Sequence, residues 1–185
     1  TLPSGVFCPL FSLKYLNLSK NHINDVSQVG FSESSFNNKN VADDNNDLFA
    51  AATGNPLASS AASAASVKTC STGVEQLDLS YNNLISIPNN CFTALRSLNF
   101  LHLDSNQLTI LDDNSFQGLD KLQFLNLTNN RLIALPPELF EKTKELKRLY
   151  IANNSLAVLA PGLFEKLYQL EVLDLSFNEL TSSWI

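Results

Sequence analysis

The sequence predicts an α/β-type solenoid, a stack of short coils with a parallel β-sheet on the concave side and irregular structure on the convex side. Three observations support this prediction: an apolar pattern recurs at a fixed spacing, an Asn ends every copy, and a Phe recurs at the same spacing. One coil alone is too small to bury its apolar side chains, so neighbouring coils must stack and share a core.

The repeated pattern reads LxxLxLxxN, with Val and Ile also occurring at the Leu positions. Five copies begin at residues 74, 98, 122, 146 and 170, so every step is 24 residues, and a sixth copy begins at residue 13. This pattern is the signature of the leucine-rich repeat, and it predicts a fragment of a horseshoe in which each coil supplies one short strand. Because strand side chains alternate, Leu at pattern positions 4 and 6 should point into the core.

The recurring Phe and Asn residues predict two structural roles. Phe occupies positions 92, 116, 140 and 164, with Phe7 and Phe31 in the same register, and these rings should stack into a spine. An Asn amide both donates and accepts hydrogen bonds, so it can satisfy backbone groups that are buried where the chain turns after each strand. This structural ladder is expected at Asn21, Asn82, Asn106, Asn130, Asn154 and Asn178.

The register predicts one continuous repeat array over residues 1–185, a length that fits a single domain. Residues 1–12 form a partial repeat, and complete repeats start near 13, 74, 98, 122, 146 and 170. Because the chain starts and ends within a coil, we expect it to be an internal fragment of a longer protein.

A long insert separates the first two complete repeats. The step from Leu13 to Val74 is 61 residues, 37 more than one repeat, and the additional residues lie at about 32–73. The first half of the insert is rich in Asn and Asp and the second half in Ala and Ser, so it can bury little apolar surface. Two interpretations stay open: a flexible surface loop, or a functional or protease-sensitive loop, since loops of this length usually have a role.

The cysteines and the glycosylation sequons favour a secretory-pathway protein. Cys8 and Cys70 lie one position apart in the repeat register, on coils that should be adjacent and close enough for a disulfide. We therefore predict a Cys8–Cys70 disulfide, with two free thiols as the alternative. Cys91 is expected to be a partly buried free thiol. Asn-x-Ser/Thr sequons predict glycosylation at Asn17, Asn126 and Asn153.

Composition argues against several classes of function. Lys and Arg total 12 against 18 Asp and Glu, a net charge of −6, so nucleic acid and anionic membranes are disfavoured as partners. No apolar run approaches the roughly 20 residues of a spanning helix, so membrane attachment would come only through a downstream segment. The sequence contains no catalytic motif, metal-ligand cluster or phosphate-binding loop, so we expect neither enzyme activity nor a cofactor.

The exposed strand positions predict a candidate binding surface on the concave side. Pattern positions 3 and 5 place aromatic side chains beside an Arg, a combination that is typical of protein-binding hot spots. The candidate partner-binding residues are Tyr15, Phe100, Phe124, Arg148 and Tyr150. Glycans at Asn17 and Asn126 would shield this face, so binding through the lateral edges or the insert is the alternative. His102 on the same face is either a solvated side chain or a partner of Asp78.

The sequence resembles the extracellular domain of arthropod Toll receptors, and among them the long-Toll (Tollo-like) subgroup. The resemblance rests on LPSGVFCPLFSLKYLNLSKN near the start, on Gly30-Phe31 before a cysteine-bearing insert, and on LDLSFNELTSSWI at the end. It covers the repeats on both sides of the insert, whereas the Asn/Ala/Ser-rich insert matches no motif of that family.

The resemblance implies a type I single-pass receptor, with this fragment on the extracellular side of the plasma membrane and a cytoplasmic TIR domain downstream. Members of the family sense Spätzle-like cystine-knot cytokines or act in innate immunity and epithelial patterning. The implied partner is such a protein ligand or another cell-surface receptor, and receptor self-association is a further expectation. The alternative is a secreted or tethered leucine-rich repeat adhesion or matrix protein without a TIR domain, and direct sensing of glycan or lipid ranks last.

Overall fold

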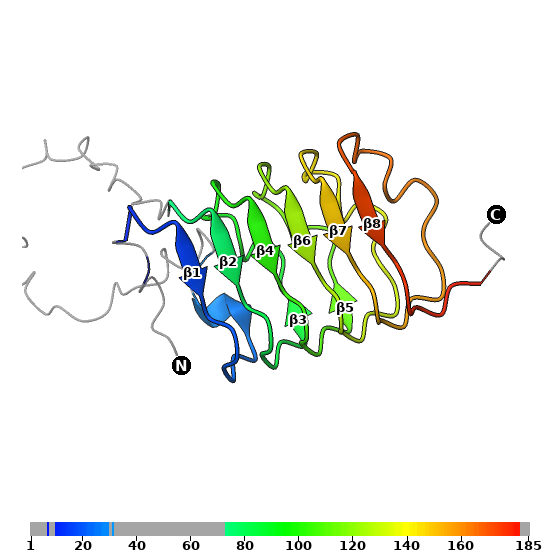
Figure 1. Ribbon diagram of the computed structural model, residues 1–185, viewed down its shortest axis with the longest axis horizontal. Coiled ribbons are helices and arrows are strands. Elements are labelled where there is room, and N and C mark those ends of the chain that lie inside the picture. Colours follow the sequence, from blue (N-terminus) through cyan, green and yellow to red (C-terminus); the bar gives the residue numbers. More distant parts are fainter. Residues whose placement is uncertain (1–6, 8–9, 30, 32–72, 182–185) are drawn as a thin grey trace, which may run out of the picture.

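The computed structural model of the chain describes residues 7, 10–29, 31 and 73–181. Six short strands form one parallel sheet in the order β1-β2-β4-β6-β7-β8, one strand from each successive coil. Figure 1 shows these strands side by side along the length of the molecule. Their bounds are Tyr15–Asn17 (β1), Gln76–Asp78 (β2), Phe100–His102 (β4), Phe124–Asn126 (β6), Arg148–Tyr150 (β7) and Val172–Asp174 (β8).

Three shorter elements lie away from the main sheet. One is a 3₁₀ helix, η1 (Val26–Val29), and the other two, β3 (Ser86–Ile87) and β5 (Ile110–Leu111), pair in parallel. Elsewhere the described coils return through turns and bends, and none of them contains an α-helix. The predicted solenoid, with its parallel sheet and irregular convex side, is therefore confirmed.

The register of the sheet follows the 24-residue spacing of the sequence. Phe124 pairs with Phe100 on one side and with Arg148 on the other, so equivalent residues of neighbouring coils lie opposite each other. Strand β1 also pairs with β2 in this register, with Tyr15 opposite Gln76, although the two residues are 61 positions apart. The sheet therefore continues across the insert. The insert itself, apart from Gly73, lies outside the described residues.

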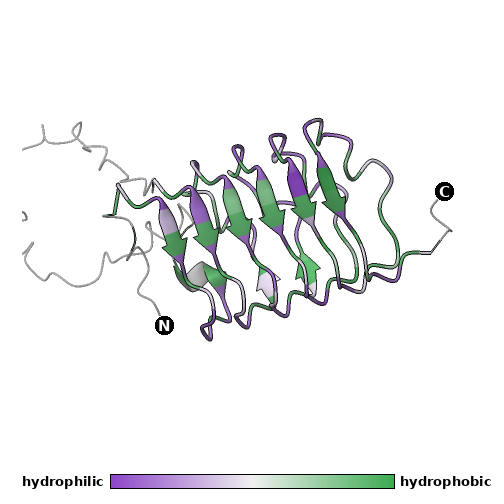
Figure 2. Cartoon of the chain, viewed as in Figure 1, coloured by the Kyte–Doolittle hydropathy of each residue, from purple (hydrophilic) through white to green (hydrophobic). Residues whose placement is uncertain are grey.

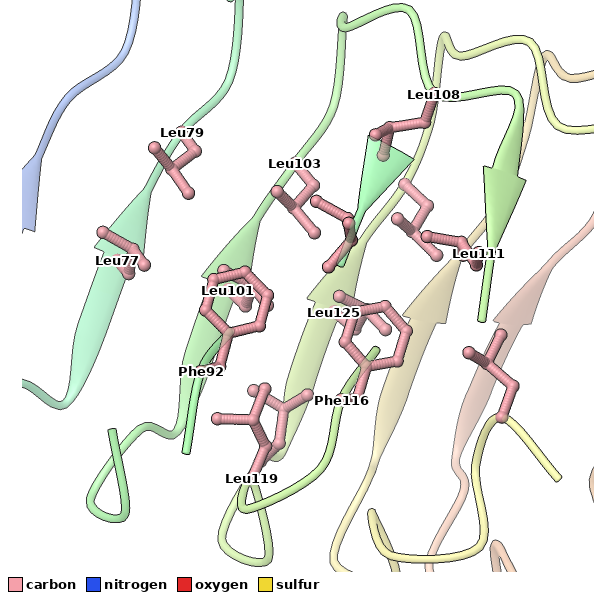
Figure 3. Packing of buried hydrophobic residues seen from close by; sticks show 14 of the residues in the cluster. Leu77, Leu79, Phe92, Leu101, Leu103, Leu108, Leu111, Phe116, Leu119 and Leu125 are labelled. Atoms are coloured by element: carbon pink, nitrogen blue, oxygen red, sulfur yellow. The ribbon is translucent and has the colours of Figure 1, made fainter. Parts of the chain in front are cut away.

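Aliphatic side chains fill the interior of the coils. The middle residue of each of the inner strands points inward, and Leu77, Leu101, Leu125 and Leu149 are 0% exposed. Figure 3 shows Leu101 and Leu125 facing the rings of Phe92 and Phe116, which come from the returning segments. Burial of these Leu side chains stabilises each coil by roughly 1.5–3 kcal/mol per residue.

Phenylalanine rings connect the returning segments of successive coils. The ring centroids of Phe116 and Phe140 are 6.4 Å apart and those of Phe140 and Phe164 are 6.0 Å apart, both in stacked geometry. Phe31 lies 6.5 Å from Phe92, so the residue that precedes the insert keeps its position in this spine. Separations of this size are favourable for aromatic pairs beyond the area that they bury.

The turn after each strand depends on an Asn side chain. The Oδ1 of Asn106 accepts the backbone N–H of Leu84 at 3.2 Å, and its Nδ2 donates to the carbonyls of Leu79 and Leu103 at 3.0 Å each. One amide therefore links its own coil to the preceding coil. The same arrangement occurs at Asn82, Asn130, Asn154 and Asn178.

Asn21 differs from the other Asn residues at this position. Its Nδ2 donates to the carbonyls of Leu18 and Ser19, both in its own coil, at 3.0 Å. The coil before it lies almost entirely outside the described residues, so the structure gives no link in that direction.

The residue before each of these Asn side chains has a left-handed backbone conformation. Its φ lies between 51° and 56° in all six coils, and none of the six residues is Gly: Lys20, Tyr81, Ser105, Asn129, Asn153 and Phe177. A left-handed conformation costs a side chain with a Cβ roughly 1–2 kcal/mol. The hydrogen bonds of the adjacent Asn hold the chain in this conformation.

We predict that Asn106→Ala lowers the free energy of unfolding by about 1–3 kcal/mol, because it leaves buried backbone groups of two coils without partners. Asn83→Ala is the matched control, since Asn83 is exposed in the same type of turn and its loss should change stability by less than about 0.5 kcal/mol. Urea unfolding followed by circular dichroism measures both values. Equal losses in the two variants would contradict the role of the ladder.

We predict that Phe116→Ala lowers the free energy of unfolding by about 3–5 kcal/mol, because the ring is 1% exposed and its loss leaves a cavity in the spine. Tyr168→Ala should have little effect, since this aromatic side chain is 75% exposed. The same unfolding experiment applies, and a loss under about 1 kcal/mol for Phe116→Ala would show that the spine is not a main source of stability.

Candidate functional site

The concave sheet face carries a group of aromatic side chains with one cation, which we call the concave cluster. Strands β4, β6 and β7 supply its members from pattern positions 3 and 5, the two positions that alternate with the buried Leu. Figure 2 shows the hydrophobic starts of β4 and β6 next to the hydrophilic start of β7. The cluster consists of Phe100, His102, Phe124, Arg148 and Tyr150.

Phe124 is the centre of the concave cluster. Its ring centroid lies 6.0 Å from that of Phe100, 4.8 Å from that of His102 and 5.5 Å from that of Tyr150. The guanidinium carbon of Arg148 lies 5.5 Å from the same centroid, within the range of a cation–π interaction. The four contacts hold the Phe124 ring from several directions, so the cluster is ordered before any partner arrives.

The rings of the cluster are less exposed than the sequence suggests. Alternation predicts Phe100 and Phe124 as exposed neighbours, but both are half-buried, as are His102 and Tyr150. The reason is lateral packing, since each ring covers part of the next one along the face. Arg148 is exposed and offers the most accessible polar group of the cluster.

Tyr15 does not join the concave cluster. It is 49% exposed on β1, and its hydroxyl accepts a hydrogen bond from Nδ2 of Asn17 at 3.1 Å. Strand β2 lies between β1 and β4 and presents Gln76 and Asp78 on this face. The structure therefore brings together four of the five predicted partner-binding residues and separates the fifth.

Acidic side chains border the cluster at the carboxyl ends of the strands. Nδ1 of His102 lies 3.8 Å from Oδ1 of Asp104, and this same oxygen accepts a hydrogen bond from Nδ2 of Asn126 at 3.1 Å. Asp78 is opposite His102 in the sheet register, but its carboxylate accepts the backbone N–H and the hydroxyl of Ser80. His102 was expected either to be solvated or to pair with Asp78, and the carboxylate that the structure places beside it is that of Asp104.

Asp174 keeps a negative charge on β8, the last strand of the sheet. The Ser176 hydroxyl and then its backbone N–H, which lies 3.0 Å from Oδ1, lower the pKa of the Asp174 carboxyl below its usual value. Both bonds favour the charged form of the carboxyl group. The concave face thus combines aromatic rings and Arg148 in the middle with fixed acidic groups toward its margin.

The three predicted glycosylation sites differ in position. Asn17 is on β1, Asn126 is on β6 inside the concave cluster, and Asn153 lies in the turn after β7. Asn153 is exposed, and its Nδ2 donates to Oδ1 of Asn129 at 2.6 Å. Asn126 lies among the aromatic rings because the register of three strands places it between His102 and Tyr150, two residues after Phe124.

Cys91 is a free cysteine and is 2% exposed. Burial raises the pKa of its thiol, so the nucleophilic thiolate is suppressed. This position fits a small apolar residue of the core more closely than a reactive group. Cys8 and Cys70, the predicted disulfide pair, lie outside the described residues.

The described ranges offer little for other kinds of chemistry. They contain no group of three or more His, Cys, Asp or Glu that could hold a metal ion. No helix within them is long and apolar enough to cross a membrane. A shallow groove of about 360 Å³ lies on the returning segments, where Pro137, Pro161 and Lys166 line part of it, and it is open to solvent.

Comparisons with known proteins identify the fold family. Residues 72–132 and 125–180 match a family model described as leucine rich repeat, and residues 10–27 match a second model of the same description. The chain belongs to the leucine-rich repeat family. Its matched segments lie on both sides of the insert, in agreement with a single sheet that includes β1.

One solved structure similar to these leucine-rich repeats is that of the Toll–Spatzle complex of Drosophila, described as a molecular hub in development and innate immunity. The TM-score is 0.50 and the sequence identity is 26%. The similarity covers 53% of this chain and 13% of that chain, so this chain spans only a small part of the Toll-complex protein. A Toll-like leucine-rich repeat is thus supported, and membership in the long-Toll subgroup stays a prediction.

We predict that Cys91 is alkylated by iodoacetamide only after the protein is unfolded, because its thiol is buried and its pKa is raised. Peptide mapping by mass spectrometry, without a reducing agent, measures the modification in native and denatured protein. The same map tests the Cys8–Cys70 disulfide, which would give one linked peptide. Rapid alkylation of Cys91 in the native state would contradict its buried position.

Proposed function

We propose that this chain is a ligand-binding segment of a Toll-type receptor ectodomain, located on the extracellular side of the plasma membrane. It binds a protein partner by surface complementarity and catalyses no reaction. The single observation that carries the proposal is the concave cluster around Phe124. The similarity to a structure of the Toll–Spatzle complex supports a secreted protein ligand of the Spatzle kind, with another cell-surface receptor as the second expected partner.

The chemistry of the cluster suits a protein partner. Aromatic and Arg side chains dominate the binding energy of protein interfaces, and here they come from adjacent strands of a rigid sheet. Because Phe124 is already held by its neighbours, binding does not need to order it, which lowers the entropic cost of association.

The charges around the cluster limit which partners fit. Arg148 is exposed, and its planar guanidinium group can receive a carboxylate through two parallel hydrogen bonds. Asp104 and Asp174 place negative charge toward the carboxyl ends of β4 and β8. We therefore expect a partner that presents an apolar side chain to Phe124, an acidic side chain to Arg148 and basic side chains toward the margin.

The receptor assignment has one alternative, a secreted or tethered leucine-rich repeat adhesion or matrix protein. The family match is to the repeat itself, which both classes of protein contain. Sequencing the transcript beyond the codon for Ile185 distinguishes them. A spanning helix and a TIR domain support the receptor, whereas matrix modules without a TIR domain support the adhesion protein.

We predict that Phe124→Glu weakens binding of the protein ligand at least about 30-fold, which corresponds to the loss of about 2 kcal/mol expected at a hot spot. Biolayer interferometry of the chain produced without N-linked glycans, against a panel of secreted cystine-knot proteins from the same organism, measures the affinity. Tyr168→Glu is the control, since Tyr168 is 75% exposed and lies outside the cluster. Unchanged affinity of Phe124→Glu for a ligand of the panel would remove the concave cluster from the proposal.

A further inference from the structure

We infer that an N-linked oligosaccharide on Asn126 covers the concave cluster, so that the occupancy of Asn126 decides whether the cluster is open to a protein partner. The functional consequence of this inference depends on the proposed function, because the glycan would control access to the same binding surface. Its physical basis is the position of Asn126 in the sheet, which can be tested without any partner.

Asn126 occupies the middle of the concave cluster. It is the last residue of β6, and the sheet register places it opposite His102 of β4 and Tyr150 of β7. Phe124 precedes it by two residues on the same strand face. Neighbouring strands lie about 4.8 Å apart and a strand rises about 3.3 Å per residue, so a group attached to Asn126 emerges one strand spacing from His102 and Tyr150 and about 7 Å along the strand from Phe124.

The amide group of Asn126 has a fixed orientation. Its Nδ2 donates to Oδ1 of Asp104 at 3.1 Å, and its Oδ1 accepts the backbone N–H of Thr128 at 3.1 Å. One bond fixes the amide nitrogen and the other fixes the amide oxygen, so the first sugar attached to Nδ2 would point in one direction. A fixed attachment beside the rings covers them more persistently than a glycan on a freely rotating side chain.

The hydrogen bonds of Asn126 are compatible with the modification. Nδ2 carries two hydrogens, and only one of them is needed for the bond to Asp104. In the transfer, Nδ2 attacks C1 of a lipid-linked oligosaccharide diphosphate, and the N–C1 bond forms as the bond from C1 to the diphosphate oxygen breaks. Nδ2 loses one proton to a base of the transferase, and the lipid diphosphate leaves. The bonds to Asp104 and Thr128 can both remain.

The other two sequons lie outside the cluster and provide internal controls. Asn17 is on β1, which β2 separates from β4. Asn153 lies beyond the end of β7 in a turn with a φ of 51°, and its amide donates to Asn129 rather than to a residue of the concave face. Glycans at these positions should leave Phe124 as accessible as it is in the unmodified protein.

The experiment compares variants of the sequon on chains secreted from glycosylating cells. Thr128→Ala removes the acceptor signal and keeps Asn126, Thr128→Ser keeps the signal, and Ser155→Ala removes only the Asn153 sequon. Glycopeptide mass spectrometry measures occupancy, and hydroxyl-radical labelling measures the exposure of Phe100, Phe124 and Tyr150. Treatment of the folded wild-type protein with an endoglycosidase, which leaves a single sugar, gives a second comparison without any substitution.

We expect glycan on Asn126 in the wild type and in Thr128→Ser, with ring labelling at least about threefold lower than in Thr128→Ala, because a glycan is bulky. Ser155→Ala should label like the wild type, and endoglycosidase treatment should increase the labelling. An unmodified Asn126 in the wild type, or equal labelling with and without its glycan, would overturn the inference. If the glycan protects the rings but Phe124→Glu does not affect ligand binding by the chain that lacks this glycan, the proposed function fails while the glycan still covers the cluster.

Discussion

Every coil must reverse direction immediately after its strand, and the amide of one Asn makes this reversal stable. The residue before that Asn has a left-handed backbone conformation that its own side chain disfavours, with φ near 56° at Ser105. Asn106 compensates by bonding to a backbone N–H and to three carbonyls, one of which belongs to the preceding coil. The same amide therefore closes the turn and links it to the preceding coil, next to the backbone hydrogen bonds that pair the strands.

The positions on the concave face follow from this constraint. Since the ladder fixes the register, pattern positions 3 and 5 of neighbouring coils must lie opposite each other, whatever residues occupy them. The structural positions hold the same residue types in coil after coil, while the concave positions vary from Gln76 to Phe100 and Arg148. A rigid scaffold with variable exposed positions can change its binding properties without affecting its stability.

The periodicity of the sequence was sufficient to predict the solenoid, the order of the strands and the buried Leu and Phe residues, because each depends on spacing alone. Side-chain conformation was not predictable in the same way. The half-burial of Phe100 and Phe124 depends on how the rings lean against each other. His102 is next to Asp104, while Asp78 accepts two hydrogen bonds from Ser80 in a local turn, and the repeat pattern reveals neither contact. Tyr15 shares the register of the cluster but is separated from it by the polar residues of β2.

The pairing of β1 with β2 has a consequence for how this array can change over evolutionary time. Tyr15 pairs with Gln76, and Phe31 keeps its contact with Phe92, so both flanks of the insert are held by the solenoid. The entropy of closing a loop grows only logarithmically, and doubling its length costs about 0.6 kcal/mol. Sequence can therefore be gained or lost between these two coils with little penalty, and length variation among related genes should concentrate at this junction.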